Sequence, residues 1–149
     1  MSRRLMVILT WLITLVAFNY AFADQKMIEL IFSRDVADRN PVDPFEPVAT
    51  CEEGAEPSGP LPTVDSATVG EVFFWNRIVS SEATDLRHTW SKDGIKVAEV
   101  DLQVGPSSGF RTWSSKKIVP KRYAGKWTVV VSRTGDPETV LCAAHFIVE

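Results

Sequence analysis

The sequence contains few of the side chains on which catalytic and metal sites are built. It has two histidines and two cysteines among its 149 residues. A nucleophilic triad needs a histidine that reaches a serine or cysteine and is oriented by a carboxylate. No strained glycine turn presents a nucleophile near His88 or His145, and the scattered acids fix no carboxylate pair of the kind that hydrolyses glycosides. We therefore expect no enzyme, no cofactor and no metal site.

The sequence also lacks an excess of basic residues. Its formal net charge is -3, and removal of Arg3 and Arg4 with an N-terminal signal would leave 14 basic against 19 acidic groups, or -5. Nucleic-acid binding needs a concentrated basic surface, so we expect no nucleic-acid partner. The acidic segment 51–56 lacks the oxygen-ligand spacing of a calcium loop and is interpreted as solvated.

Residues 1–23 have the features of an export signal. Two arginines precede an apolar run over residues 5–18, and Ala21-Phe22-Ala23 has the small-x-small form of a cleavage site. We predict cleavage before Asp24 and a periplasmic or secreted protein. The alternative is an uncleaved anchor, because the apolar run approaches the length of a membrane span; this segment would then be the membrane contact.

Export would place Cys51 and Cys142 in a compartment where disulfides persist. One bridge would tie a proline-rich segment to the last predicted strand. It would close a ring of about 90 residues, which the chain-entropy model values at roughly 4 to 5 kcal/mol. The alternatives are two free thiols or a soft-metal site with His145, although these ligands form no recognisable metal motif.

After residue 24 the apolar residues alternate, and no amphipathic helical window appears. The predicted strands cover residues 27–32, 69–80, 86–104 as a hairpin, 111–118, 126–132 and 140–148. Residues 34–62 contain six prolines and are predicted to be a long irregular loop. Six or seven short strands predict an all-β fold, an antiparallel two-sheet β-sandwich of immunoglobulin-like form. A small barrel is the alternative.

We expect one domain, in which an N-terminal strand and proline-rich acidic loop (24–68) join a sandwich core (69–149). The hairpin could turn in two registers. A two-residue Asp93-Gly94 turn would place Leu86 opposite Asp101 and mix buried with charged positions. A three-residue loop gives the pairs Leu86–Val100, Arg87–Glu99 and His88–Ala98. We predict the second register because opposite charges then face each other.

Several short motifs follow one another in a recognisable order. They are His88-Thr89-Trp90, Asp93-Gly94, Val97-Ala98-Glu99-Val100, Arg111-Thr112-Trp113-Ser114-Ser115-Lys116, Gly125-Lys126-Trp127-Thr128-Val129 and Phe146-Ile147-Val148. Together they resemble the bacterial family known as domain of unknown function 2914, over residues 69–149 and more loosely over 38–44. The resemblance implies a small β-rich extracytoplasmic module with no established activity, and it supplies no catalytic residues.

The tryptophans past the signal, Trp75, Trp90, Trp113 and Trp127, have two interpretations. All four could fill the core. If Trp90 or Trp113 instead faces water, it could stack on a sugar ring while nearby cations hold an anionic substituent. The candidate ligand-binding residues are His88, Trp90, Arg111, Trp113, Ser115 and Lys116.

His88 is predicted to face inward, where a lone histidine is typically structural. We expect a non-catalytic, exported module of the bacterial envelope that binds a protein or another envelope component. A protein partner would use an edge strand or the proline-rich loop. The alternative is carbohydrate or cell-wall glycan binding through an exposed tryptophan and arginine.

Overall fold

The computed structural model describes residues 25–149 with the exception of residues 46 and 53. The predicted signal at residues 1–23, and its alternative as an anchor, lie outside the described residues. Within the described part of the chain, no helix has the length and apolar character needed to cross a membrane.

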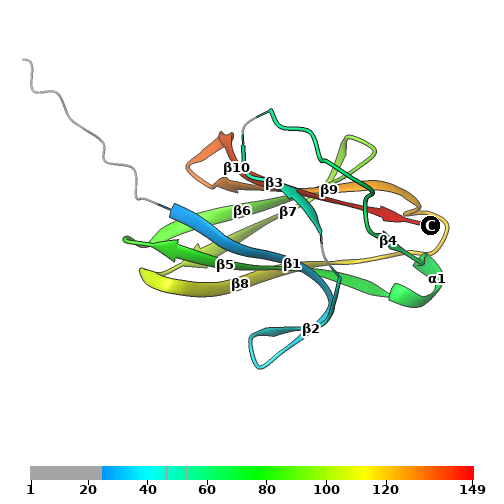
Figure 1. Ribbon diagram of the computed structural model, residues 1–149, viewed down its shortest axis with the longest axis horizontal. Coiled ribbons are helices and arrows are strands. Elements are labelled where there is room, and N and C mark those ends of the chain that lie inside the picture. Colours follow the sequence, from blue (N-terminus) through cyan, green and yellow to red (C-terminus); the bar gives the residue numbers. More distant parts are fainter. Residues whose placement is uncertain (1–24, 46, 53) are drawn as a thin grey trace, which may run out of the picture.

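Two β-sheets pack face to face (Figure 1). The strands are β1 (Gln25–Ala37), β2 (Asn40–Phe45), β3 (Val48–Thr50), β4 (Thr63–Val64), β5 (Glu71–Ser80), β6 (Thr84–Lys92), β7 (Ile95–Val104), β8 (Ser107–Lys117), β9 (Gly125–Arg133) and β10 (Asp136–Val148). The four-stranded sheet has the order β2-β1-β5-β8, and the six-stranded sheet has the order β3-β10-β9-β6-β7 with β4 parallel to β10. Apart from the short or edge strands β2, β3 and β4, a β1-β5-β8 set lies opposite a β10-β9-β6-β7 set, which is an immunoglobulin-like arrangement. The predicted all-β sandwich is confirmed.

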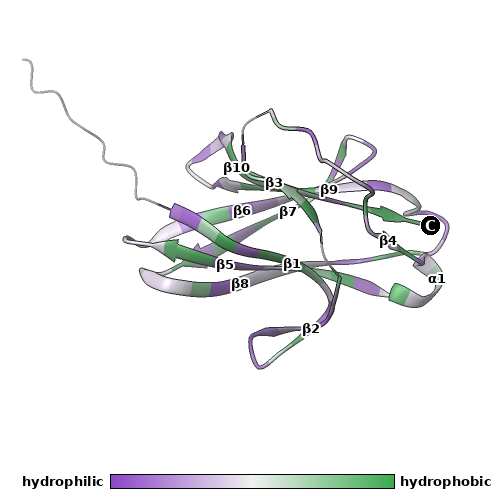
Figure 2. Ribbon diagram, viewed as in Figure 1, coloured by the Kyte–Doolittle hydropathy of each residue, from purple (hydrophilic) through white to green (hydrophobic). Residues whose placement is uncertain are grey.

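Phe32 joins the two sheets in the core. Its ring centroid lies 4.8 Å from that of Phe74 in its own sheet and 4.7 Å from that of Phe146 in the opposite sheet. Hydrophobic and hydrophilic residues alternate along the facing strands (Figure 2), as expected when one face of each sheet is buried. On β9 and β10 the inward-facing residues are buried: Trp127, Val129, Val131, Cys142, Ala144, Phe146 and Val148.

The predicted irregular loop over residues 34–62 is wrong in its first part. β1 continues to Ala37, turns at Asp38 and Arg39, and pairs with β2. Both turn residues have positive φ, 48° and 63°, as in the two-residue turns that match the twist of a hairpin. The prolines of β2 are tolerated because β2 is an edge strand and needs few ladder donors. Residues 51, 52 and 54–62 contain no strand or helix.

The predicted hairpin register is also wrong. Asp93 and Gly94 form a two-residue turn with φ values of 49° and 80°, and a shift after Trp90 leaves Val97 as an extra residue on β7. The observed pairs are Leu86–Leu102, Arg87–Asp101 and His88–Val100. The bulge restores the match of apolar with apolar residues that a plain two-residue turn would lose.

Several predicted boundaries move as well. A four-residue helix, α1 (Ser66–Val69), precedes β5, so this strand begins at Glu71. The Asp65 side chain accepts from the Ala67 N–H at the start of α1, and Gly70 ends it with a φ of 64°. β8 and β10 begin four residues earlier than predicted, at Ser107 and Asp136.

Cys51 and Cys142 form the predicted disulfide. The bridge lies beside the pairing of β3 with β10, so it fastens the start of the 51–62 segment to the last strand. Because both cysteines are in the bridge, neither is a free thiol or a metal ligand in this structure.

The double variant Cys51→Ser/Cys142→Ser should lose about 4 kcal/mol of unfolding free energy, because opening a ring spanning 91 residues restores entropy to the unfolded chain. Urea denaturation of the oxidised protein and of the variant measures the loss. Equal midpoints would show that the bridge does not constrain the unfolded chain.

Candidate functional site

The structure places the six predicted ligand-binding residues in three separate locations. His88 and Trp90 lie on the inner face of β6 and have no exposed surface, so this structure does not support their assignment as ligand contacts. Arg111, Trp113 and Ser115 project from the outer face of the four-stranded sheet, on β8. Lys116 points to the other side of β8, where its Nζ lies 5.7 Å from the ring centroid of Tyr123.

His88 is the centre of a polar network inside the sandwich. Its Nε2 lies 2.6 Å from Asn76 Oδ1 on β5, and its Nδ1 lies 2.7 Å from Ser114 Oγ on β8. Trp90 Nε1 donates to the same Ser114 Oγ at 3.0 Å. Asn76 Oδ1 only accepts, so His88 carries its proton on Nε2, and Ser114 donates its hydroxyl hydrogen to Nδ1. These bonds link the two sheets through the core.

This network needs His88 to be neutral. Burial lowers the pKa of His88 from its ordinary 6.5 to about 3, because a charged imidazole would lose its hydration without gaining an anionic partner. A serine, a histidine and an amide are thus brought together, but the core seals them from solutes. The arrangement stabilises the fold.

The second histidine, His145, lies on β10 next to β9, on the face opposite Phe146. His145 Nδ1 lies 3.0 Å from Thr128 Oγ1, and its Nε2 is buried without a hydrogen-bond partner among the described residues. Burial lowers the pKa of His145; Lys126 lowers it further, and Glu56 opposes the shift.

Arg111 and Trp113 line a shallow groove on the outer side of the four-stranded sheet. In Figure 1 the β1–β2 hairpin projects on this side of the sheet. Its turn is held against β5 because Trp75 Nε1 donates to the Arg39 carbonyl at 2.9 Å, which also explains why Trp75 is buried on an outward face. The groove has a volume of about 230 Å³, and we call it the Arg39 groove. Its lining residues are Arg39, Phe110, Arg111, Thr112 and Trp113.

The Arg39 guanidinium closes one side of this groove. Its Nη2 donates to the Arg111 carbonyl at 3.0 Å, and its Cζ lies 5.9 Å from the Phe110 centroid and 6.0 Å from the Trp113 centroid. These distances are within the range of cation–π attraction. One donor is used on the backbone, which leaves other guanidinium N–H groups for a ligand.

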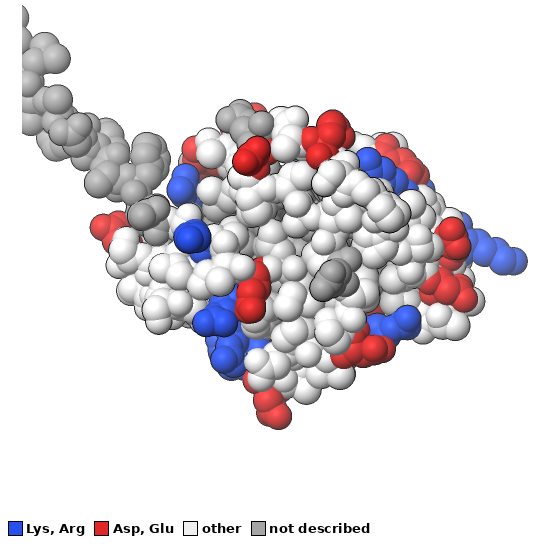
Figure 3. Space-filling view, viewed as in Figure 1, with Lys and Arg blue, Asp and Glu red and all other residues white. Residues whose placement is uncertain are grey.

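Positive charge accumulates beside the groove. Arg77 on β5 lies directly opposite Arg111 on β8, and the anion that pairs with Arg77 is Glu29, at 3.5 Å. Among the described residues, neither Arg39 nor Arg111 forms an ion pair with a carboxylate. Figure 3 shows basic side chains gathered at the lower left of the view, with acidic side chains beside them.

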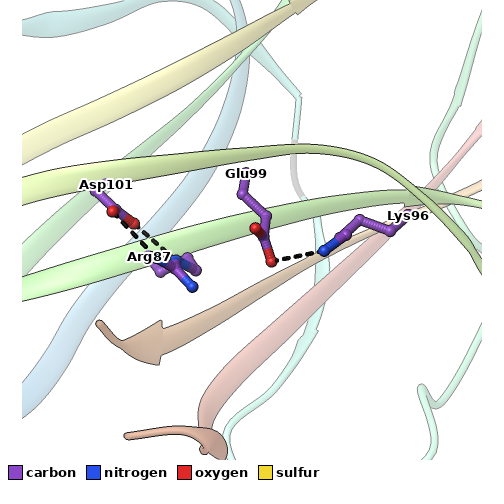
Figure 4. Close-up of polar contacts among 4 residues, drawn as sticks. All are labelled: Arg87, Lys96, Glu99 and Asp101. Carbon is purple, nitrogen blue, oxygen red and sulfur yellow. Dashed lines mark hydrogen bonds and ion pairs between the residues drawn. The ribbon is translucent and has the colours of Figure 1, made fainter. Parts of the chain in front are cut away.

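The six-stranded sheet arranges its charges differently. On β6 and β7, Arg87 donates to Asp101 through Nε at 2.7 Å and Nη2 at 3.1 Å, while Lys96 bonds to Glu99 at 3.1 Å (Figure 4). The hydrogen bonds between Arg87 and Asp101 raise the pKa of Arg87 and lower that of Asp101. Arg87 is therefore neutralised by its cross-strand partner, whereas Arg111 faces another arginine.

Comparison with known proteins finds a family match over the C-terminal strands. Residues 83–148 match the family model described as protein of unknown function, DUF2914. The predicted resemblance is confirmed over these residues. No curated protein matches the chain. The DUF2914 match includes all of β8 but not Arg39 or Arg77, so the groove combines a family strand with a turn outside the match.

Arg39, Arg77 and Phe110 were not among the predicted site residues. The sequence predicts an irregular loop around Arg39, although residues 38–44 carry the looser part of the family resemblance. The Asp38-Arg39-Asn40 sequence could have predicted the turn that positions Arg39. Asp and Asn are enriched at the positive φ values of tight hairpin turns.

The free energy of unfolding should fall as the pH drops from about 6.5 to 5. The folded-state pKa of His88 is depressed, so the unfolded chain binds a proton that the folded protein excludes, at up to about 1.4 kcal/mol per pH unit. Urea denaturation across this range measures the slope of the unfolding free energy against pH. Asp93 and Asp101 have lowered pKa values and stay ionised in this range. His88→Asn should flatten the slope, and His145→Asn should retain most of it. Equal slopes for the protein and His88→Asn would contradict the buried neutral histidine.

Two tryptophan variants test the division between core and groove. Trp90→Ala removes a fully buried ring and should cost about 3 to 5 kcal/mol. Trp113→Ala removes a partly exposed ring on the outer face and should cost less than half as much. Chemical denaturation compares them, and equal losses would mean that Trp113 belongs to the core.

Proposed function

We propose that this protein is an exported, non-catalytic binding module of the bacterial envelope that engages another envelope component through the Arg39 groove. The observation that carries the proposal is a partly exposed tryptophan flanked by Arg39 and Arg111, neither of which has a carboxylate partner among the described residues. Aromatic rings and arginines are the side chains that most often dominate recognition surfaces.

Export is supported by the signal features of residues 1–23 and by the disulfide, which persists in oxidising compartments. These two features support a periplasmic or secreted location. The non-catalytic part of the proposal is supported by His88, whose serine and asparagine contacts are sealed in the core. A general base must reach the proton that it abstracts from a substrate.

A protein is the first candidate for the bound component, and the supporting observation is the edge strand β7. It has ten residues, it ends the six-stranded sheet, and its Ile95 is 72% exposed. An edge strand offers backbone donors and acceptors to an extended partner segment. β7 and β8 are edge strands of the two sheets and contact each other, so a protein paired with β7 would lie beside the strand that carries Arg111 and Trp113.

A glycan is the second candidate, and the supporting observation is Trp113 itself. An indole face beside two arginines can stack on a sugar ring and hold an acidic substituent. Ser115 adds little, because its hydroxyl is already bonded to Glu71 at 2.6 Å.

Binding can be measured by tryptophan fluorescence during titration with soluble peptidoglycan fragments. We expect quenching in the protein and at least a tenfold weaker response in Trp113→Phe, whereas Ile95→Gln on β7 should respond like the protein. For a protein partner, a photo-crosslinker at position 95 should capture an envelope protein, and one at the exposed position 138 on β10 should not. Failure of both experiments would refute the binding function.

A further inference from the structure

The register of β5 and β8 creates an electrostatic conflict. Arg77 and Arg111 are direct cross-strand partners on the outer face, and like charges in this position destabilise a sheet. Arg39 adds a third guanidinium, since its Nη2 lies 3.0 Å from the Arg111 carbonyl. The described carboxylate in this group is Glu29, 3.5 Å from Arg77.

The chain also makes room for this arrangement. A Cβ on Gly109 would lie 2.9 Å from Arg77 Nε, so the absence of a side chain at Gly109 lets the Arg77 side chain lie across β8. Gly109 therefore leaves room for Arg77 beside Arg111. On the other sheet, by contrast, Arg87 has a carboxylate opposite it. Glu29 pairs with Arg77 alone, so an external anion beside Arg39 and Arg111 would offset the remaining repulsion.

We infer that the Arg39 groove binds an acidic sugar residue, with its carboxylate, sulfate or phosphate between Arg39 and Arg111 and its ring against Trp113. This inference rests on the proposed function and specifies its ligand. The planar guanidinium presents paired N–H donors that match such oxyanions. Trp113 supplies the adjoining ring surface.

The shape of the groove favours a compact ligand over an extended peptide. Its volume of about 230 Å³ is below the roughly 300 to 1,000 Å³ of sites for drug-sized ligands. A partner strand on β8 would need the backbone groups of this strand, and the Arg111 carbonyl already accepts from Arg39. A single acidic ring needs only the arginine donors and the indole face.

Calorimetric titration of the full chain tests the inference, with glucuronate and glucose as a matched pair and ionic strength held constant. Glucuronate should bind at least tenfold more tightly than glucose. Arg39→Gln and Arg111→Gln should each weaken glucuronate binding at least tenfold. Arg87→Gln, which removes an arginine from the other sheet, should leave it unchanged.

Arg111→Glu gives a second, independent readout. It replaces the like-charge pair with an opposite-charge pair, so it should raise the thermal midpoint of unfolding while abolishing glucuronate binding. A lower thermal midpoint together with unchanged glucuronate binding would contradict both the repulsion between Arg77 and Arg111 and the anion site.

Equal affinities for glucuronate and glucose, or no effect of Arg111→Gln, would overturn the inference. An acidic peptide that binds more tightly than glucuronate with the same arginine dependence would overturn the sugar assignment and indicate a protein ligand. If Trp113-dependent binding of peptidoglycan fragments or crosslinking from β7 persists in Arg111→Gln, the binding function survives and only the anion site fails.

Discussion

The packing of Phe32 between Phe74 and Phe146 is the interaction on which the other features depend. It fixes β1 to both layers of the sandwich, because the ring packs against aromatic residues of both sheets. Complete burial of such a side chain is worth about 1.5 to 3 kcal/mol in transfer free energy alone. Once β1 is fixed at Phe32, the β1–β2 turn lies within reach of β8, so this core contact also sets the location of the groove.

The parts of the fold that the sequence predicts are those governed by burial alone. On β9 buried residues occur at every second position from Trp127 to Val131, and this period of two is typical of a strand with one covered face. The sequence does not predict β2, because its prolines argue against a strand. Proline is excluded only where the sheet needs a backbone N–H donor, and the sequence does not show that β2 is an edge strand. The sequence also does not predict the extra residue at Val97. Asp93 and Gly94 are suited to the turn in either register, and only the packing of β7 against β6 decides between the two.

The same limit applies to the site. The sequence identifies Arg111 and Trp113 as alternating residues on one face of a strand, but it cannot say which tryptophan is covered. Trp75 is on the outer face and is nevertheless buried, because the Arg39 turn lies over it. Arg77 became relevant only through the pairing of β5 with β8, and cross-strand neighbours are a property of register that composition and local pattern do not contain.

Arg39 connects the stability of the fold with its capacity to bind. Its carbonyl is fixed by the Trp75 indole and its guanidinium by the Arg111 carbonyl, so both ends of the residue are held by the protein. A ligand that meets a fixed guanidinium does not have to order a long flexible side chain, a cost that often reaches about 0.5 to 1.5 kcal/mol. The hydrogen bonds that hold the turn thus also pre-organise the groove. An exposed arginine without such contacts would provide the same charge but would bind an anion more weakly and with less defined geometry.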